Sequence, residues 1–404
     1  MSTPTDLGVD PERFARLDTV LHRYVDEGKL PGVQTAVTRR GELVHRDCYG
    51  VTDVESGAPV QPDTIYRIYS MTKPITSIAL LMLFEEGRFL LDDPITRWLP
   101  ELADLQVWTG GTADAPETRP AATPITVHQV LTHTAGFTYG FQYVHPVDEL
   151  YRRVDVGDFT VPSYDLDEMM ARLGELPLLY EPGTRWGYSV ATDVCGALIE
   201  RLSGERLDVH LRRRVLEPLG MVDTGFHAPA DDLDRCSTLY VTLPGAQPRT
   251  PMLPASSMTV PPKLLSGGGG LVGTTDDYLR LCHLLLNGGE LDGVRLLSPR
   301  TLSLMTRNHL PGGQDLNAMG QATFSETEMA GMGFGLGFSV LLDAAANRTT
   351  ASEGTFAWGG AASTAFWVDP AAEVCVVFMT QLLPSSTYPL RKHLQAGVYQ
   401  ALTD

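Results

Sequence analysis

The sequence predicts an α+β protein, in which both ends of the chain build a central antiparallel sheet flanked by helices. A mainly helical domain is expected to be inserted between the two halves. Two observations predict this arrangement: strand-like hairpins cluster near both ends of the 404-residue chain, and helical periods and loops fill its middle. A sheet completed by both chain ends and covered by helices is a layered α+β arrangement.

The N-terminal part begins with a predicted helix over Asp10–Gly28, because its apolar residues recur with a helical period that stops at a glycine. Two strands, Val33–Thr38 and Leu43–Tyr49, are expected to follow it. The turn around Arg40-Gly41 lies between them, so the pair predicts a hairpin.

The C-terminal part repeats the strand pattern in the stretches FAWGG, STAFWVDP and EVCVVFMTQ. Asp369-Pro370 is the expected turn between the last two stretches. The final stretch, Tyr388 to Leu402, is expected to be helical.

The domain boundaries follow from this distribution of elements. Residues 1–91 and 263–404 are expected to form a discontinuous sheet domain, and residues 92–262 a helical and loop-rich insert. Within the insert, Asp104–Pro124 is rich in Thr, Ala, Gly and Pro and is expected to be a surface loop.

Composition restricts the possible partners and the compartment. The formal charge of −18 argues against a nucleic-acid partner, because such affinity comes largely from Lys and Arg. The five cysteines are odd in number and widely spaced, which argues against a disulfide framework or a zinc site. We expect them to be small buried hydrophobic residues. The first residues lack a signal-peptide pattern, and the longest apolar run, Ile78–Phe84, is too short to span a bilayer. We therefore expect a cytoplasmic protein with no membrane partner; its oligomeric state stays open.

The tetrad Ser70-Met71-Thr72-Lys73 is the first candidate for chemistry. The chain has four lysines, and only Lys73 has a serine three residues before it. The helical period from Met71 to Glu86 places Ser70 at a helix start, with Lys73 one turn later on the same face. A serine needs a nearby base to become a nucleophile, and a lysine at this spacing can reach it. The alternative is an N-cap serine beside an exposed lysine.

Two further features suggest a cleft. Tyr188 follows a turn and precedes a predicted helix over Val190–Leu202, so it stands at a loop–helix junction, although a packing role for this ring is an alternative. Gly359 and Gly360 interrupt a strand pattern directly after Trp358, which marks a bulge or a close approach of a ligand to the backbone.

Taken together, these three elements resemble the penicillin-recognising serine hydrolases, a superfamily with a β-lactamase/transpeptidase-like fold. Ser70–Lys73 resembles its nucleophile motif, and Tyr188-Ser189-Val190 resembles its Tyr-x-Asn motif. Trp358-Gly359-Gly360 stands in the place of its Lys-Thr-Gly strand, a pattern typical of the family VIII carboxylesterases and related acyltransferases. The similarity runs from about Phe14 to beyond Thr380.

The resemblance implies roles for individual residues. Ser70 would attack an acyl carbonyl, Lys73 and Tyr188 would handle its proton as general base and acid, and the backbone N–H groups of Ser70 and Ala361 would form the oxyanion hole, in a cleft between the two domains. The expected substrate-binding residues are Trp358, Gly359, Gly360, Val190, Tyr139 and His133. No cofactor is implied, and no metal is expected, because His128 and His133 are five apart and no His-Glu-x-x-His occurs.

The leading hypothesis is a serine carboxylesterase that acts on small to medium neutral esters. Two alternatives keep the same machinery: an acyltransferase acting on a secondary metabolite, and an amide or β-lactam hydrolase. A non-catalytic relative that only binds a ligand is a further alternative, and the intact Ser70, Lys73 and Tyr188 argue against it. Two residues favour esters over lactams: Val190 stands where the lactamases have Asn, and Trp358 stands where they have a cation.

Overall fold

The computed structural model describes residues 3–243, 249–319 and 329–404. Its largest sheet within these residues has the strand order β11-β12-β13-β14-β15-β1-β2. All neighbouring pairs are antiparallel. The strands are β1 (Gly32–Arg39), β2 (Glu42–Gly50), β11 (Met332–Phe334), β12 (Ser339–Leu341), β13 (Phe356–Gly359), β14 (Ala365–Asp369) and β15 (Val374–Met379).

The two ends of the chain meet in the middle of this sheet. The first strand, β1, pairs with the last long strand, β15, so that Gln34 lies opposite Met379. Every residue of β1 is buried, as expected of a strand covered on both faces. Segments near the two chain ends also meet, since Val9 forms a bridge with Leu402. The predicted α+β class and the sheet built from both ends are therefore confirmed.

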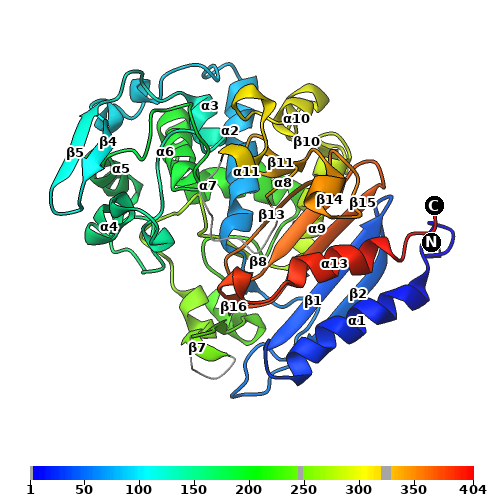
Figure 1. Ribbon diagram of the computed structural model, residues 1–404. Helices are drawn as coiled ribbons and strands as arrows, with labels where there is room; N and C mark the ends of the chain where they lie inside the picture. The colour runs from blue at the N-terminus through cyan, green and yellow to red at the C-terminus, as the bar shows by residue number, and fades with distance from the viewer. Residues whose placement is uncertain (1–2, 244–248, 320–328) are drawn as a thin grey trace.

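Helices cover both faces of the sheet. One face carries α1 (Pro11–Asp26) and α13 (Leu390–Tyr399), which pack on each other in front of the sheet in Figure 1. The other face carries α9 (Thr275–Leu286), which packs on β14, β15 and β1. Asp10 caps α1 by accepting from the Glu12 N–H, so this helix begins where the sequence predicts.

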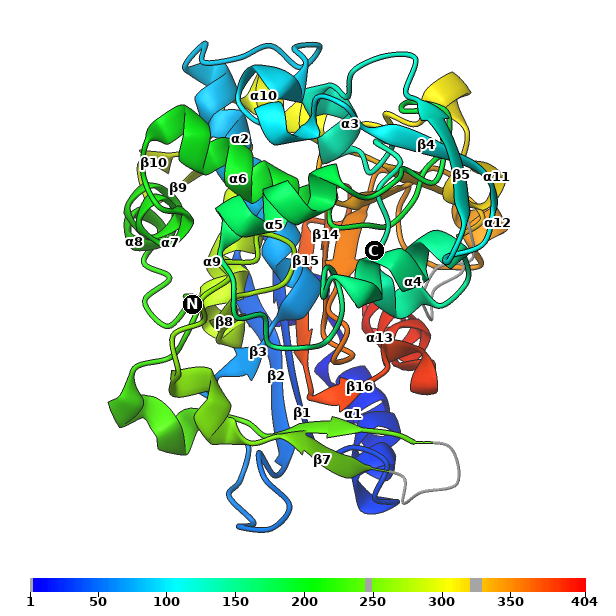
Figure 2. The same ribbon diagram turned by 90° about the vertical axis from the view of Figure 1, so that its left-hand side faces the viewer.

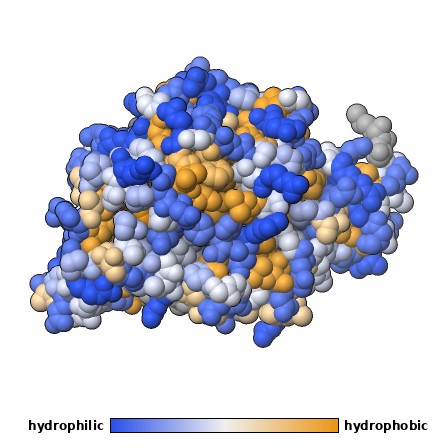
Figure 3. Space-filling model, turned by 90° about the horizontal axis from the view of Figure 1, so that it is seen from above, coloured by the Kyte–Doolittle hydropathy of each residue, from blue (hydrophilic) through white to orange (hydrophobic). Residues whose placement is uncertain are grey.

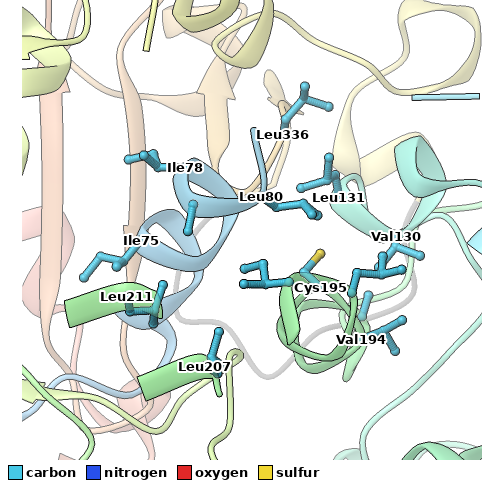
Figure 4. Packing of buried hydrophobic residues seen from close by; sticks show 14 of the residues in the cluster. Ile75, Ile78, Leu80, Val130, Leu131, Val194, Cys195, Leu207, Leu211 and Leu336 are labelled. Carbon is cyan, nitrogen blue, oxygen red and sulfur yellow. The ribbon is translucent and has the colours of Figure 1, made fainter. Parts of the chain in front are cut away.

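The helical part of the molecule packs on α2 (Thr72–Glu85). This helix is buried on nearly all sides, and Figure 4 shows its Ile75, Ile78 and Leu80 within one apolar core with side chains from neighbouring helices. The other α-helices in the described part of the chain are α3 (Val127–Leu131), α4 (Pro146–Arg153), α5 (Leu166–Gly174), α6 (Ala191–Ser203), α7 (Leu207–Leu211), α8 (Glu217–Leu219), α10 (Pro299–Met305), α11 (Leu316–Met319) and α12 (Ala344–Asn347).

The largest core cluster contains residues of both the expected sheet domain and the expected insert, for example Phe366 and Val194. The described parts of the two regions thus share one core, and the boundaries at 91/92 and 262/263 stay a prediction. Short sheets complete the fold: β3 (Tyr66–Arg67) with β8 (Val272–Gly273), β9 (Glu290–Leu291) with β10 (Val294–Arg295), and β6 (Leu239–Val241) between β7 (Thr250–Leu253) and β16 (Leu382–Leu383).

One expectation for the insert is wrong. The segment Asp104–Pro124, expected to be a surface loop, contains the hairpin β4 (Gln106–Gly111) and β5 (Pro116–Pro120), which projects at the edge of the molecule in Figure 2. Its register shifts between Trp108 and Gly110, so the strand pattern is irregular. The exposed β5 also lacks the apolar alternation that would have revealed a strand.

The surface is largely hydrophilic, with apolar atoms gathered near the middle of the face seen in Figure 3. Among the described residues, no helix combines the length and the apolar character needed to cross a membrane.

Candidate active site

Ser70 lies in a short 3-10 helix, Tyr69–Met71, that leads directly into α2. The residue before it, Tyr69, has φ of 44°, a left-handed conformation that costs a non-glycine residue on the order of 1–3 kcal/mol. Such strain persists only where the surrounding structure imposes it, and it is concentrated at functional sites. The predicted helix start is thus a tight turn that presents Ser70, which is partly exposed, at the end of α2.

Lys73 occupies the first turn of α2, and its side chain is fully buried. Its Nζ donates to three oxygens: Gly268 O at 2.7 Å, Tyr139 Oη at 2.9 Å and Ser70 Oγ at 3.2 Å. A lysine ammonium has three N–H donors, so each can have an acceptor here. The structure therefore holds the Lys73 amine beside Ser70 without leaving a buried donor unpaired.

Tyr188 reaches Ser70 from the loop before α6. Its hydroxyl donates to Ser70 Oγ at 2.5 Å, and the indole Nε1 of Trp358 donates to the same hydroxyl at 3.4 Å. Lys73 Nζ lies 4.6 Å from the centroid of the Tyr188 ring, a distance at which the ring stabilises a cation. Ser70 Oγ thus contacts two groups that can take and return its proton.

Asp193 lies beneath this cluster and was not singled out from the sequence. Its buried carboxylate accepts from Ser266 Oγ at 2.5 Å and from the Gly268 N–H at 3.1 Å. Burial raises the pKa of Asp193, and the hydrogen bond from Ser266 and the charge of Lys73 act in the opposite direction. A side chain at Gly268 would approach Asp193 Oδ2 to 2.7 Å, so the glycine run is a close turn around this carboxylate. The sequence did contain a signal for Asp193, because it is a charged residue among the buried, mainly apolar positions of α6.

Tyr139 is expected to bind substrate, and this role stays a prediction; the structure places the residue beside Lys73. The side chain is buried and does not line the pocket, and its hydroxyl accepts from Lys73. Burial raises the pKa of Tyr139 well above its ordinary value, and the nearby Tyr188 and Asp193 act in the same direction. Tyr139 is therefore a neutral phenol that holds Lys73 in place.

His133 and Val190 are also expected at the substrate; both side chains are buried, and their role at the substrate stays a prediction. His133 Nδ1 is 3.1 Å from Ser189 Oγ, and its ring packs against Tyr188. Burial and the charge of Lys73 lower the pKa of His133 well below its ordinary value, so the ring stays neutral. Among the described residues, no group of three His, Cys, Asp or Glu side chains could hold a metal ion.

An apolar pocket opens beside Ser70. Trp358, Gly359 and Gly360 line it, and their contact with a substrate stays a prediction. The rest of the wall is mainly aromatic and aliphatic and includes Phe141, Trp186, Leu316, Met329 and Met332, which the sequence argument missed. Trp186 had a signal, because it lies two residues before Tyr188 in the same loop.

The two expected oxyanion donors face the same pocket, since Ser70 and Ala361 both line it. Within residues 3–243, 249–319 and 329–404, neither of their backbone N–H groups donates to a protein acceptor. Two N–H donors beside a nucleophile can stabilise the negative charge of a tetrahedral intermediate. The arrangement is chemically suited to acyl transfer through Ser70.

Comparisons with known proteins agree with this geometry. The family model described as Beta-lactamase matches residues 17–400. The chain is 33% identical to esterase EstB of Burkholderia gladioli, over 98% of each chain, and 38% identical to a protein of Mycobacterium tuberculosis, over 90% of this chain and 89% of that one. Among solved structures, EstCE1, "a hydrolase with promiscuous acyltransferase activity", superposes with a TM-score of 0.82 at 29% identity, covering 96% of this chain and 99% of that one.

Proposed function

Because the chain belongs to the Beta-lactamase family, we propose that it is a serine carboxylesterase that hydrolyses small to medium neutral esters. One observation carries this proposal: Ser70 Oγ lies within hydrogen-bond distance of both Lys73 Nζ and Tyr188 Oη. A nucleophile that contacts two proton-handling groups is the arrangement that acyl transfer requires.

The first half of the reaction forms an acyl-enzyme. Ser70 Oγ bonds to the carbonyl carbon while its proton passes to the Lys73–Tyr188 pair, and the carbonyl oxygen becomes an oxyanion between the N–H groups of Ser70 and Ala361. The bond to the alcohol oxygen then breaks, and Tyr188 returns a proton to that oxygen. The second half repeats these steps with water as the nucleophile, which releases the carboxylic acid and restores the Ser70 hydroxyl.

The chemistry of the wall supports esters rather than lactams. A substrate carboxylate would need a cation and hydroxyl groups to offset its burial, and Trp358 and Gly359 offer neither. Arg391 and Lys392 also line the pocket, but both donate to backbone carbonyls. Position 190 offers no side-chain amide to a substrate, because the residue there is a valine, and its side chain is fully buried. The similarity to esterase EstB supports the same choice.

A panel of p-nitrophenyl esters of graded acyl length, run beside a chromogenic cephalosporin, tests the proposal. We expect turnover of neutral esters and slow or absent turnover of the cephalosporin. Ser70→Ala is the control, because its remaining turnover measures the background hydrolysis that does not pass through Ser70. Cephalosporin hydrolysis that rivals the best ester would move the protein to the lactamase side of the family.

Acyl transfer to an alcohol is the second candidate function. The similarity to EstCE1, described as a hydrolase with promiscuous acyltransferase activity, and the apolar wall beside Ser70 favour it. Product analysis in the presence of an added alcohol separates the two: a new ester indicates transfer, and free acid alone indicates hydrolysis.

A cytoplasmic location is also part of the proposal. All five cysteines are free, and four of them are buried, which fits a reducing compartment. Fractionation of cells that express the tagged protein tests this point, and recovery outside the cytoplasmic fraction would contradict it.

A further inference from the structure

We propose that Arg391 is a positioning residue for the oxyanion hole, acting from the side of the sheet that carries α13. Its guanidinium binds the carbonyl of the peptide bond whose N–H belongs to Ala361. This inference rests on the proposed function, because an oxyanion forms only if Ser70 attacks an acyl carbonyl.

The contacts define the orientation of this peptide. Arg391 Nη2 donates to Gly360 O and to Thr364 O, both at 3.1 Å, and the Ser363 N–H also donates to Gly360 O, at 3.1 Å. A trans peptide is planar, so its N–H points opposite to its C=O. Fixing Gly360 O on Arg391 and Ser363 therefore directs the Ala361 N–H away from them, into the pocket that Ser70 shares.

The two glycines of the Trp-Gly-Gly motif make this arrangement possible. A Cβ atom at Gly359 would lie 2.3 Å from Arg391 Nη2 and 2.5 Å from Arg391 Cζ. A Cβ atom at Gly360 would lie 2.5 Å from the carbonyl oxygen of Ile68, two residues before Ser70. The first glycine admits the guanidinium, and the second lets the turn approach the segment that carries the nucleophile.

The charge of Arg391 matters as well as its position. Hydrogen bonds from an ionised donor are roughly twice as strong as neutral ones. A strong bond at the carbonyl polarises the peptide, so that its N–H becomes a better donor at its other end. This effect is largest when full negative charge develops on the substrate oxygen, in the transition state, so it acts on kcat more than on KM.

A purely structural role makes a different prediction. If Arg391 only ties α13 to the sheet, its removal lowers the free energy of unfolding but leaves the turnover of the folded fraction unchanged. An oxyanion role also predicts a slower inactivation by a serine-directed phosphonate, because this reaction passes through the same charged geometry.

The test is Arg391→Ala assayed with a p-nitrophenyl ester. We expect kcat to fall about 10- to 100-fold, less than or similar to the loss of a whole oxyanion donor, with KM within about twofold. The phosphonate inactivation rate should fall in parallel, and millimolar guanidinium should restore part of kcat. The matched control is His393→Ala, which removes another contact of α13, because His393 Nδ1 lies 3.3 Å from Tyr24 Oη of α1 and the residue is not among those that line the pocket. Equal kcat values in the two folded variants would overturn the inference.

Gly359→Ala tests the same contact if Arg391→Ala does not fold. The added methyl group displaces the guanidinium without removing the arginine, and it would also lie 2.7 Å from Thr364 O, so we expect a loss of kcat at least as large as that of Arg391→Ala. A folded Gly359→Ala variant with wild-type kcat would refute the role of Arg391. Failure of the proposed function is distinguishable, because the phosphonate would then leave Ser70 of the wild-type protein unlabelled.

Discussion

The floor and the wall of the site differ in their chemistry. The floor consists of Lys73, Tyr139, Asp193 and Gly268, which are joined by hydrogen bonds and buried under Ser70. The wall consists largely of aromatic and aliphatic side chains such as Trp358, which offer shape but few polar atoms. Buried polar groups are costly unless each has a partner, so the floor tolerates few substitutions. An apolar wall can accept other apolar side chains and so change its shape. The floor therefore sets the reaction, and the wall sets which ester reacts.

The largest effect is expected at the point where floor and wall meet. Ser70→Ala should leave a folded protein, since the residue is partly exposed and small, and should lower kcat by about a thousandfold or more. Ester turnover with the purified variant measures this directly. Substantial residual turnover would place the nucleophile elsewhere.

The next largest effect concerns Lys73 and Tyr188, which share Ser70 as a partner. Removing a general base or acid costs about 100- to 10,000-fold, so Lys73→Ala and Tyr188→Phe should each be severe. Because the two act as one unit, the double variant should be little worse than either single variant. Losses that multiply in the double variant would show that the two residues act independently.

A smaller loss is expected deeper in the floor. Asp193→Asn keeps an acceptor oxygen for Ser266 and Gly268 but removes the charge near Lys73. We expect kcat to fall about tenfold, roughly 1.4 kcal/mol, with KM unchanged. A changed KM at constant kcat would instead show that Asp193 contributes to substrate binding.

Substitution in the wall should change selectivity rather than chemistry. Trp358→Ala removes a ring that packs against Tyr188 and Phe334, and should change the ratio of kcat/KM between short and bulky neutral esters about threefold or more. Thermal unfolding serves as the control. An unchanged ratio in a destabilised protein would make Trp358 a packing residue.

The smallest effect is a dependence of stability on pH. The pKa of Asp193 is raised in the folded protein, so ionisation of this carboxyl disfavours folding. The protonated carboxyl therefore stabilises the folded protein. This stabilisation is full below about pH 3.9, the pKa of an aspartate in the unfolded chain, and is lost as pH rises through the pKa of Asp193 in the folded protein. Asp193→Asn should therefore gain stability relative to the wild type as pH rises above about 4, which thermal unfolding at several pH values measures. A difference that is constant with pH would contradict this reasoning.

The sequence revealed those parts of the site that depend on local structure. The tetrad places Ser70 and Lys73 together through helix geometry alone, and the terminal hairpins appear as strand patterns because their pairing is local. The structure adds contacts between segments that are far apart in the chain. Asp193 binds Gly268 over 75 positions, and Arg391 binds Gly360 over 31. No periodicity encodes such contacts, so the floor beneath Lys73 and the support of the oxyanion turn could not be read from the sequence.

The same reason explains why the burial of three expected substrate-binding residues could not be read from the sequence. Tyr139, His133 and Val190 lie close to the motif residues, but which side of the pocket wall they occupy depends on tertiary packing. In the structure all three side chains are buried; Tyr139 accepts from Lys73, and His133 contacts Ser189 beside Tyr188.

The acyl-enzyme on Ser70 is the central claim, and mass spectrometry of the intact protein tests it most directly. After brief incubation with a p-nitrophenyl ester and acid quenching, we expect a mass increase equal to the acyl group, located by fragmentation to Ser70 and absent from Ser70→Ala. An acyl group on any other residue, or catalytic turnover in which no acylated protein can be trapped from either the ester or a phosphonate, would contradict the account.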